Sequence, residues 1–322
     1  MTDLGPVALV INPVATKAGR GTRAELTRIL SPLGLEWSLT TAAHGDAARL
    51  ARQAADEGAR VVVTLGGDGT AAEAASALAD GPVVMAPMPG GNANVFSRAL
   101  GWPSSAARAL PVLAEALARG TVREATLGRV QLDGEERIFA INAGVGIDAA
   151  TVEWIEARPR TKRRLRHAGF ALGAVAATLR AGREPHLAVA ADGADDLEAM
   201  AVLVACGSPY TYLGPRPLDL VPGATFDGHL AWVALARVRP GEIGGLVVRA
   251  LRGRELPLGG PTLRGGAVET VLTVRAEQPV PVQADGEVLG RHTEVRISPG
   301  PTLLVLDPRP ATPLKSRPGT PT

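Results

Sequence analysis

The chain has 322 residues, of which 46% are apolar and 20% are charged. This composition supplies enough apolar surface for a large core and excludes bulk disorder. A net charge of +2 gives no electrostatic argument for nucleic-acid binding, and a single cysteine excludes an internal disulfide framework. The sequence shows no long uncharged apolar run and no basic leader. We therefore expect a protein of a reducing compartment without a membrane span.

The first 122 residues alternate between short apolar runs and segments with apolar residues at helical spacing. Strands are predicted at 7–12, 35–41, 61–65 and 83–88, and helices at 23–30, 46–57, 70–79, 95–100 and 106–119. Strands that alternate with helices form parallel sheets covered by those helices. Residues 1–122 are therefore predicted to form an α/β domain, to whose sheet a late apolar segment at about 300–307 returns.

The pattern changes after Gly120 to a series of short strands separated by Gly, Pro and Asp turns. Strands are predicted at 123–132, 137–143, 187–191, 200–205, 229–236, 269–274, 280–284 and 293–297, and helices at 149–157, 165–180 and 242–251. Such a series is typical of a β-sandwich, so residues 123–299 are predicted to form a second domain of that class. Residues 308–322 carry five prolines and are predicted to be a disordered tail.

Three loops rich in glycine or asparagine follow predicted strands of the first domain. They cover residues 12–19, 66–70 (GGDGT) and 90–94. The carboxyl ends of parallel strands meet at one sheet edge, where glycines let backbone N–H groups approach phosphate oxygens. Asp68 can hold Mg²⁺ or order this site, and Thr70 can cap the next helix or bind a phosphate. Taken alone, the GGDGT loop is also compatible with an ordinary strand-to-helix turn.

The segment Gly66–Glu73 (GGDGTAAE) resembles the GGDGT signature of the diacylglycerol kinase catalytic family, which also contains sphingosine and ceramide kinases and small bacterial lipid kinases. Other segments resemble further motifs of this family in the same order, namely Asn12–Thr16, Gly90–Gly101 (GGNANVFSRALG), Phe139–Asp148 (FAINAGVGID), Pro222–Leu230 (PGATFDGHL) and Asp285-Gly286-Glu287. The chain departs from the family pattern at Val14–Thr16, Ala72, Asn92, Ser208 and Phe226. The matches nevertheless span residues 12–287, which is nearly the whole chain.

The resemblance implies an ATP-dependent lipid kinase that phosphorylates the hydroxyl of diacylglycerol or a similar lipid and uses Mg²⁺. It implies an NAD-kinase-like first domain that binds the nucleotide and a second domain that binds the substrate. The residues that it assigns to the nucleotide are Asn12, Pro13, Val14, Ala15, Thr16, Thr41, Gly66, Gly67, Asp68, Gly69, Thr70, Glu73, Gly91, Asn92 and Asn94.

Phosphoryl transfer to a hydroxyl needs a phosphate cradle, a cation, and a group that orients or deprotonates the alcohol. Asp285 and Glu287 are the candidate bases, with Glu287 preferred, and Asp68 is the third candidate catalytic carboxylate. If the late segment is extended, the side chains of Asp285 and Glu287 point to the same side. An ordinary Asp-Gly turn with a solvated Glu is the alternative.

The resemblance also implies a structural Mg²⁺ site at Asp227. The carboxylate would be joined there by the backbone carbonyl oxygens of Ala224 and His229, a donor set that is ordinary for this ion. A β-turn aspartate without a metal is the alternative. The segment 144–149 has the spacing G-x-G-x-x-A of a dinucleotide fingerprint, but the stretch that follows is basic rather than acidic. We interpret it as a structural turn.

The run Arg158–Arg166 holds six basic residues and no acidic one, and an apolar segment follows it. Such a combination suits an anionic lipid surface, although a solvated charged face is the alternative. We expect a cytoplasmic protein that contacts the inner membrane face peripherally, binds lipid and nucleotide but no nucleic acid, and is compatible with a homodimer. A kinase of a soluble alcohol, such as NAD, and a nucleotide-binding regulatory module without catalysis stay as rival hypotheses.

Overall fold

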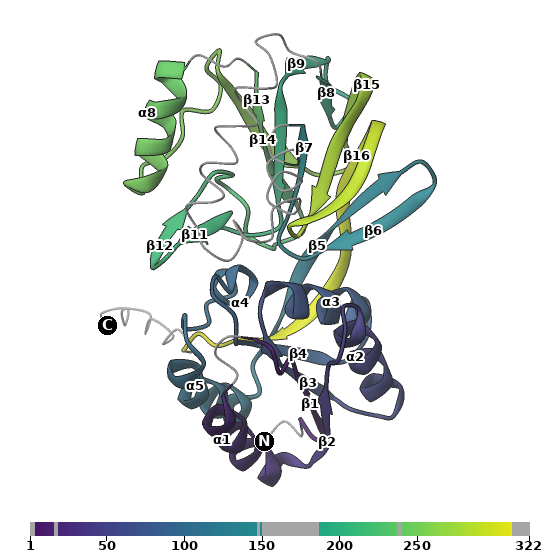
Figure 1. Cartoon of the computed structure of the whole chain (residues 1–322), viewed down its shortest axis with the longest axis vertical. Helices are drawn as coiled ribbons and strands as arrows, with labels where there is room; N and C mark the ends of the chain where they lie inside the picture. The colour runs from purple at the N-terminus through teal and green to yellow at the C-terminus, as the bar shows by residue number, and fades with distance from the viewer. Residues whose placement is uncertain (1–3, 16–18, 147–148, 150–186, 237–239, 311–322) are drawn as a thin grey trace, which may run out of the picture.

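The structure of the chain is a computed structural model that describes residues 4–15, 19–146, 149, 187–236 and 240–310. Figure 1 shows two lobes, with the N-terminal lobe below and the strand-rich lobe above. The basic run 158–166, the predicted helix 165–180, all but the first residue of the predicted helix 149–157, and residues 311–322 of the predicted tail lie outside the described residues.

The N-terminal lobe is a parallel sheet covered by helices. Its strands follow the order β2 (Leu35–Thr40), β1 (Val7–Ile11), β3 (Val61–Gly66) and β4 (Val84–Pro89), and its helices are α1 (Arg20–Leu30), η1 (Ser31–Leu33), α2 (Asp46–Asp56), α3 (Asp68–Leu78), α4 (Val95–Ala99) and α5 (Ala106–Arg119). Strands β1, β3 and β4 are buried along their whole length, because α1 and α5 lie on one side of the sheet and α2 and α3 on the other (Figure 1). The predicted parallel α/β class is confirmed.

The second lobe is strand-rich, as predicted for a β-sandwich class. Its antiparallel core contains β7 (Asn142–Gly146), β10 (Ala201–Ala205), β13 (Leu230–Leu235), β14 (Leu263–Val268), β15 (Leu272–Ala284) and the first part of β16 (Glu287–Leu306). Smaller elements complete it, namely β8 (Leu187–Ala191), β9 (Leu197–Ala199), β11 (Thr211–Leu213), β12 (Arg216–Leu218) and helix α8 (Pro240–Leu251).

Strand β16 joins the two lobes. It pairs antiparallel with β15 and with β5 (Val122–Leu132), and its last residues reach β4, where Val305 pairs with Met85 in parallel. β5 in turn forms a hairpin with β6 (Glu135–Phe139). Within the described residues, one hydrogen-bonded sheet therefore continues from lobe to lobe. Strands β5 and β16 run through both lobes (Figure 1), so they determine how the two lobes are positioned relative to each other.

The structure differs from the predicted elements mainly in the second lobe. The predicted strand 137–143 is interrupted after Phe139 and resumes at Asn142 as β7. The interruption arises because the carboxylate of Asp285 takes up the backbone N–H groups of this segment, which removes them from strand pairing. The predicted strand 280–284 and residues 272–274 of the predicted strand 269–274 belong to the single strand β15, which begins three residues later than predicted. The elements β9, β11, β12 and β14 were not predicted, since each is short or glycine-containing.

Candidate active site between the lobes

The three predicted loops lie together at the carboxyl ends of β1, β3 and β4. The side-chain Nδ2 of Asn12 donates a hydrogen bond of 2.9 Å to Oγ1 of Thr70. The backbone N–H of Asn12 donates to the carbonyl of Leu65 over 2.9 Å, and that of Gly90 donates to the carbonyl of Gly66 over 2.7 Å. The residues predicted from three separate loops therefore form one continuous surface at the sheet edge.

Close backbone approach explains several of the glycines in these loops. A Cβ atom on Gly91 would lie 2.7 Å from the Cα of Gly67, and one on Gly90 would lie 2.9 Å from the backbone nitrogen of Gly66. Real Cβ atoms do not occupy such positions, so these glycines let two loops pack backbone against backbone. Gly69 differs because it is exposed and has open space at its Cβ position. Gly69 is therefore free to lie against a ligand.

Asp68 connects the GGDGT loop to helix α4. Its Oδ1 accepts a hydrogen bond of 3.1 Å from the backbone N–H of Phe96, so the carboxylate caps the N-terminus of that short helix. Burial raises the pKa of Asp68 to about 6, against the opposing effect of the N–H donors of Phe96, Val95 and Asn94. A carboxylate with this pKa exchanges its proton near neutral pH.

The loop at residues 90–94 is held by its own asparagine. Asn94 is buried, has a φ of 49°, and binds Gly91 twice, from the Gly91 N–H to Oδ1 over 2.8 Å and from Nδ2 to the Gly91 carbonyl over 3.0 Å. Asn92 in the same loop is exposed. Asn94 therefore shapes the loop, whereas Asn92 leaves its side chain available to a ligand.

The remaining predicted nucleotide residues lie around this surface. The Val14 side chain is 87% exposed, and its N–H donates to Oδ1 of Asn12 over 3.1 Å. Pro13 is exposed and Ala15 is partly buried. Thr41 is buried and joins the end of β1 through a 2.9 Å bond from its N–H to the carbonyl of Ile11. Thr16 lies outside the described residues.

Glu73, also predicted to contact the nucleotide, caps a different helix. Its two carboxylate oxygens accept the backbone N–H groups of Gly45 over 2.9 Å and Ala47 over 3.1 Å, at the N-terminus of α2. The ring nitrogen Nδ1 of His44 lies 2.9 Å from Oε1 of the same carboxylate. Glu73 thus orders the loop before α2, and its side chain is only 12% exposed.

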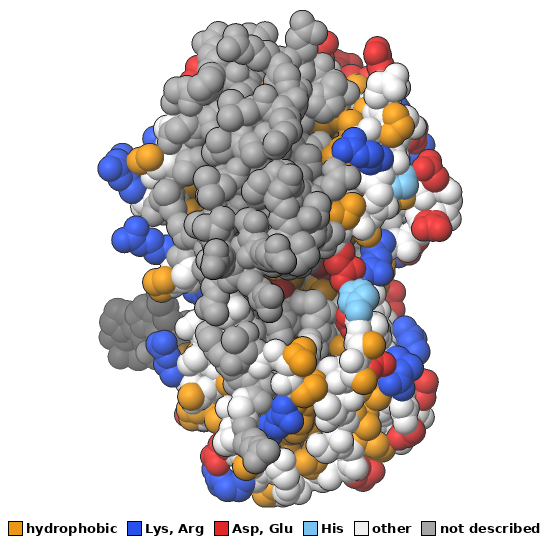
Figure 2. Space-filling view, in the orientation of Figure 1, with side chains coloured by type: hydrophobic (Ala, Val, Ile, Leu, Met, Phe, Trp, Pro, Cys, Tyr) orange, Lys and Arg blue, Asp and Glu red, His pale blue; other side chains and the backbone are white. Residues whose placement is uncertain are grey.

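A cavity of about 130 Å³ lies between the lobes. Figure 2 shows acidic and histidine side chains gathered at the level where the two halves meet. The first lobe contributes residues of the loop before α2 and of α3, and the second lobe contributes residues of β6 and of the β15–β16 turn. Its polar lining residues include His44, Glu73, Arg137, Asp285 and Glu287, and Gly69 and Ala72 also line it.

The segment Asp285-Gly286-Glu287 is a turn, so the condition under which the two side chains would point to the same side is not met. Ala284 and Glu287 pair with each other, and the two residues between them have φ angles of 51° and 81°. This is a two-residue hairpin turn of the type that favours Asp-Gly, because both residues adopt the left-handed region. The side chains of Asp285 and Glu287 therefore make separate contacts instead of sharing one face of a strand.

Asp285 is held by a set of backbone donors. Its Oδ2 accepts the N–H of Ala140 over 2.7 Å, and its Oδ1 accepts those of Ile141 and Asn142 over 2.8 and 3.1 Å. Burial raises the pKa of Asp285 to about 6 despite these donors, and the charge of Asp68 raises it further. The two aspartates are thus electrostatically coupled across the cleft, although they belong to different lobes.

Among the described residues, the carboxylate of Glu287 contacts the side chains of Arg137 and His44 and no backbone N–H group. Its Oε2 lies 2.7 Å from Nη2 of Arg137, and its Oε1 lies 3.4 Å from Nε2 of His44. The Glu287 side chain is 34% exposed. Glu287 can therefore move within the cavity, whereas Asp285 is fixed by the backbone.

The predicted metal residues lie away from this cavity. Asp227 is exposed, Ala224 is buried, and His229 is partly buried just before β13. Asp227 lies within electrostatic reach of the guanidinium groups of Arg123 and Arg309. No group of three His, Cys, Asp or Glu residues that could hold a metal occurs in the described part of the chain. The predicted site consists of one carboxylate and two backbone carbonyls, a kind of site that such a group does not represent, so the metal role of Asp227 stays a prediction.

Sequence reasoning missed three residues that join the lobes, namely His44, Arg137 and Arg98. The guanidinium of Arg98 in α4 lies 3.2 Å from the centre of the Tyr212 ring, and it donates to the carbonyls of Gly214 and Pro215 over 3.3 and 3.2 Å. A histidine just before a helix start is a usable signal in a chain with only five histidines. Arg98 and Arg137 offer no such signal, since the chain has many arginines.

The rings of Phe96 in the first lobe and Phe226 in the second lobe add an apolar contact between the lobes. They meet edge to face, with centroids 5.9 Å apart and an interplanar angle of 77°. Phe226 stands where the family pattern has an aspartate, and its ring fills the space that a side chain at Gly207 would need. This departure from the pattern therefore has a packing role between the lobes.

None of the helices in the described residues combines the length and apolarity needed to cross a membrane.

Comparisons with known proteins agree with this architecture. Residues 6–130 match the family model of the diacylglycerol kinase catalytic domain. The structure of a diacylglycerol kinase from Bacillus anthracis str. Sterne is 21% identical, covers 94% of this chain and 96% of its own, and superposes with a TM-score of 0.68. A candidate diacylglycerol kinase from the same organism is 23% identical, with coverages of 95% and 96% and a TM-score of 0.74. A search of curated proteins gave no match.

The two solved structures show the fold. Residues 6–130, which are less than half of the chain, match the diacylglycerol kinase catalytic domain, and this match agrees with the resemblance seen in the sequence motifs. The matched part of the chain is thus similar to a kinase catalytic domain.

Proposed function

We propose that the protein transfers the terminal phosphoryl group of ATP to the hydroxyl of diacylglycerol or a similar lipid. The observation that carries this proposal is the position of the cavity, with the predicted nucleotide loops near one wall and the Asp285-Gly286-Glu287 turn at the other. Phosphoryl transfer depends mainly on positioning and on compensation of negative charge. A cavity between a phosphate-binding edge and a carboxylate is suited to both tasks.

In this proposal the nucleotide phosphates lie along the loop surface formed by Asn12, Gly69 and Thr70. Thr70 already accepts a hydrogen bond from Asn12, so its hydroxyl proton remains free to donate to a phosphate oxygen. Mg²⁺ bound together with the phosphates would neutralise their charge. Asp68 is the carboxylate within these loops and is the residue that would hold this ion.

We assign the role of general base to Glu287 rather than to Asp285. The oxygens of Asp285 accept three backbone N–H groups, so a proton arriving there would have to displace part of a structural network. Among the described residues, the Glu287 carboxylate is held by the side chains of Arg137 and His44 and keeps lone pairs for a hydroxyl. Asp285 then positions the turn that carries Glu287.

Membrane contact and cytoplasmic location belong to the same proposal and rest on the sequence. The basic run 158–166 would bring the cavity to an anionic surface, at about 1 kcal/mol for each charge near the lipid.

The test is a transfer assay with labelled ATP, in which diacylglycerol and other lipids in mixed micelles are compared with NAD. A labelled product that extracts into chloroform supports the proposal. A labelled product that stays in water favours a kinase of a soluble alcohol, and nucleotide binding without transfer favours a regulatory module. Either of these two results overturns the proposed function.

A variant of the base sharpens the assay. Glu287→Gln should lower the rate constant for transfer by about 10²–10⁴-fold, the usual contribution of general acid–base catalysis, and should leave nucleotide affinity nearly unchanged. Glu294→Gln is the matched control, because Glu294 lies on the same strand and pairs only with exposed arginines. If the two variants have equal activity, Glu287 is not the base.

A further inference from the structure

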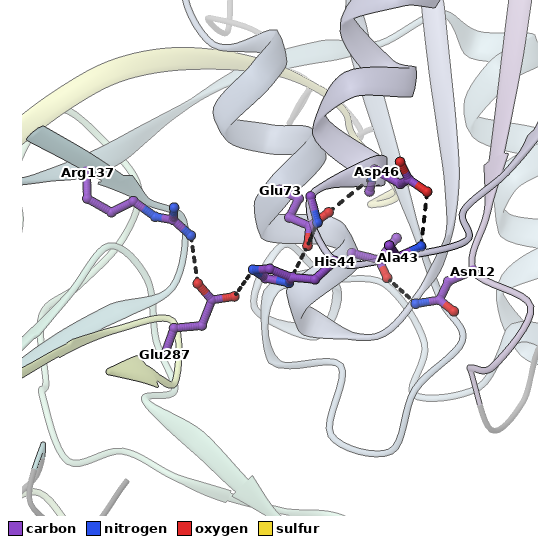
Figure 3. A network of polar contacts seen from close by, with 10 residues as sticks. Asn12, Ala43, His44, Asp46, Glu73, Arg137 and Glu287 are labelled. Atoms are coloured by element: carbon purple, nitrogen blue, oxygen red, sulfur yellow. Dashed lines mark hydrogen bonds and ion pairs between the residues drawn. The ribbon is translucent and has the colours of Figure 1, made fainter. Parts of the chain in front are cut away.

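His44 touches carboxylates of both lobes. Its Nδ1 lies 2.9 Å from Oε1 of Glu73 in α3, and its Nε2 lies 3.4 Å from Oε1 of Glu287 at the start of β16. Figure 3 shows the ring between the two carboxylates, with Arg137 on the far side of Glu287. His44 is thus a bridge across the cavity in which the proposed transfer takes place.

Both ring nitrogens of His44 face carboxylate oxygens. A carboxylate only accepts hydrogen bonds, so each of the two contacts is a hydrogen bond only when the ring nitrogen that faces it carries a proton. The other charged groups around the ring are Asp46 in α2, Arg137 in β6 and Asp285 in the β15–β16 turn. Glu73 and Glu287 are the two carboxylates that the ring contacts directly.

The two ends of the bridge differ in rigidity. Glu73 is fixed by the N–H groups of Gly45 and Ala47, so the first lobe supplies a stationary anchor. Glu287 has no backbone donor in the contacts of the described residues and is held by Arg137 on the side away from His44. The bridge therefore acts on Glu287, and its strength determines how firmly that carboxylate is kept in the cavity.

We infer that His44 is a positioning residue for phosphoryl transfer, whose ring anchors on Glu73 and holds the Glu287 carboxylate toward the acceptor hydroxyl. This inference rests on the proposed function. Loss of the ring leaves Arg137 as the remaining side-chain partner of Glu287 among the described residues. His44 thus acts on the reaction without touching the reacting atoms.

The size of the effect follows from exposure. The His44 side chain is 71% exposed, and an exposed ion pair shifts an equilibrium by at most about fivefold. We therefore expect a rate effect of about two- to fivefold, far smaller than the loss expected at Glu287 itself. Added salt should reduce it, because exposed charges are screened over about 10 Å at 0.1 M.

The experiment compares the rate constant for transfer and the KM for ATP in the wild type, H44Q and H44K at low and at high salt. At low salt the wild type should exceed H44Q by about two- to fivefold in the rate constant, with the KM for ATP unchanged, because H44Q loses the ion pair with Glu287. H44K restores a cation at this position, so it should also exceed H44Q at low salt, and added salt should reduce both differences. The control is H292Q, because His292 pairs with Asp133 within the second lobe and should not change the rate constant.

A stability measurement tests the bridge independently of activity. In thermal unfolding at pH 6, H44Q and E287Q should be non-additive by about 1 °C or more, as expected for coupled exposed charges. Non-additivity without any lipid phosphorylation retains the bridge and refutes the proposed function. Additive effects, or equal rate constants of the wild type and H44Q at low salt, overturn the inference about His44.

Discussion

Replacing Asp285 by asparagine tests the balance between burial and hydrogen bonding in the cleft. Asparagine has nearly the same shape, but its amide nitrogen cannot accept the N–H of Ala140 that Oδ2 accepts over 2.7 Å. Above pH 6 the variant also removes a buried charge. We therefore expect its effect on the free energy of unfolding to depend strongly on pH.

The magnitude follows from the pKa of Asp285. Its pKa is about 6 in the native protein, above the ordinary value of 3.8, because burial outweighs the backbone donors. The native state therefore binds the proton more tightly than the unfolded state does, and the resulting stabilisation is present at low pH and lost as the pH rises through 6. From pH 7.5 to pH 5, the wild type should gain about 1.4 kcal/mol of unfolding free energy relative to D285N.

Urea unfolding of both proteins at the two pH values measures this difference, and Asp192 supplies a matched control. Asp192 also has a left-handed φ, of 50°, and also accepts three backbone N–H groups, from Glu269, Thr270 and Val271. Its pKa is nevertheless lowered, because burial raises it less than the three donors lower it. The wild type and D192N should therefore keep a constant difference from pH 7.5 to pH 5, and the wild type should lose stability relative to D192N only as the pH falls toward and below 3.8. If the unfolding free energy of the wild type relative to D285N does not increase from pH 7.5 to pH 5, the hydrogen bonds outweigh burial at Asp285 and our reasoning is refuted.

The remaining predictions concern the loops and the contact between lobes. Gly91→Ala should destabilise the protein by about 1–3 kcal/mol and weaken nucleotide binding, because the new methyl group would meet the Gly67 backbone 2.7 Å away. Gly69→Ala has open space and should be nearly neutral in urea unfolding, and equal losses in both variants would contradict the packing argument. Arg98→Gln should cost about 1–2 kcal/mol in urea unfolding, since it removes the cation–π contact with Tyr212 and charged hydrogen bonds. A change below about 0.3 kcal/mol would show that this contact does not hold the lobes.

The sequence was sufficient for the first lobe because its signals are local. Buried runs such as Val61–Leu65 end at glycines, and amphipathic segments such as 46–57 carry an acidic residue in their first turn, so strands and helices follow from local pattern alone. The meeting of three loops also follows, because parallel strands bring their carboxyl ends to one edge. The predicted strand 137–143 failed because its interruption depends on a carboxylate about 145 positions away.

The contacts across the cleft could not be predicted for a related reason. His44, Arg98 and Arg137 acquire their roles only when the two lobes face each other, and no periodicity in the sequence encodes that arrangement. The two glycine pairs in the loops show the same limit. Their spacing suggested a phosphate cradle, whereas the structure adds that Gly90 and Gly91 must lack a side chain in order to approach the backbone of Gly66 and Gly67.

The tripeptide Ala-Asp-Gly illustrates how tertiary environment gives a short motif its chemistry. It occurs at Ala191–Gly193 and at Ala284–Gly286, and in both places the Asp and Gly have left-handed φ angles directly after a strand. Both aspartates also accept three backbone N–H groups. Only Asp285 is buried strongly enough, and close enough to Asp68, to have a raised pKa. Since the local sequence and backbone are shared, the difference between the two turns comes from their tertiary surroundings, which desolvate Asp285 more strongly and place the charge of Asp68 from the opposite lobe near it.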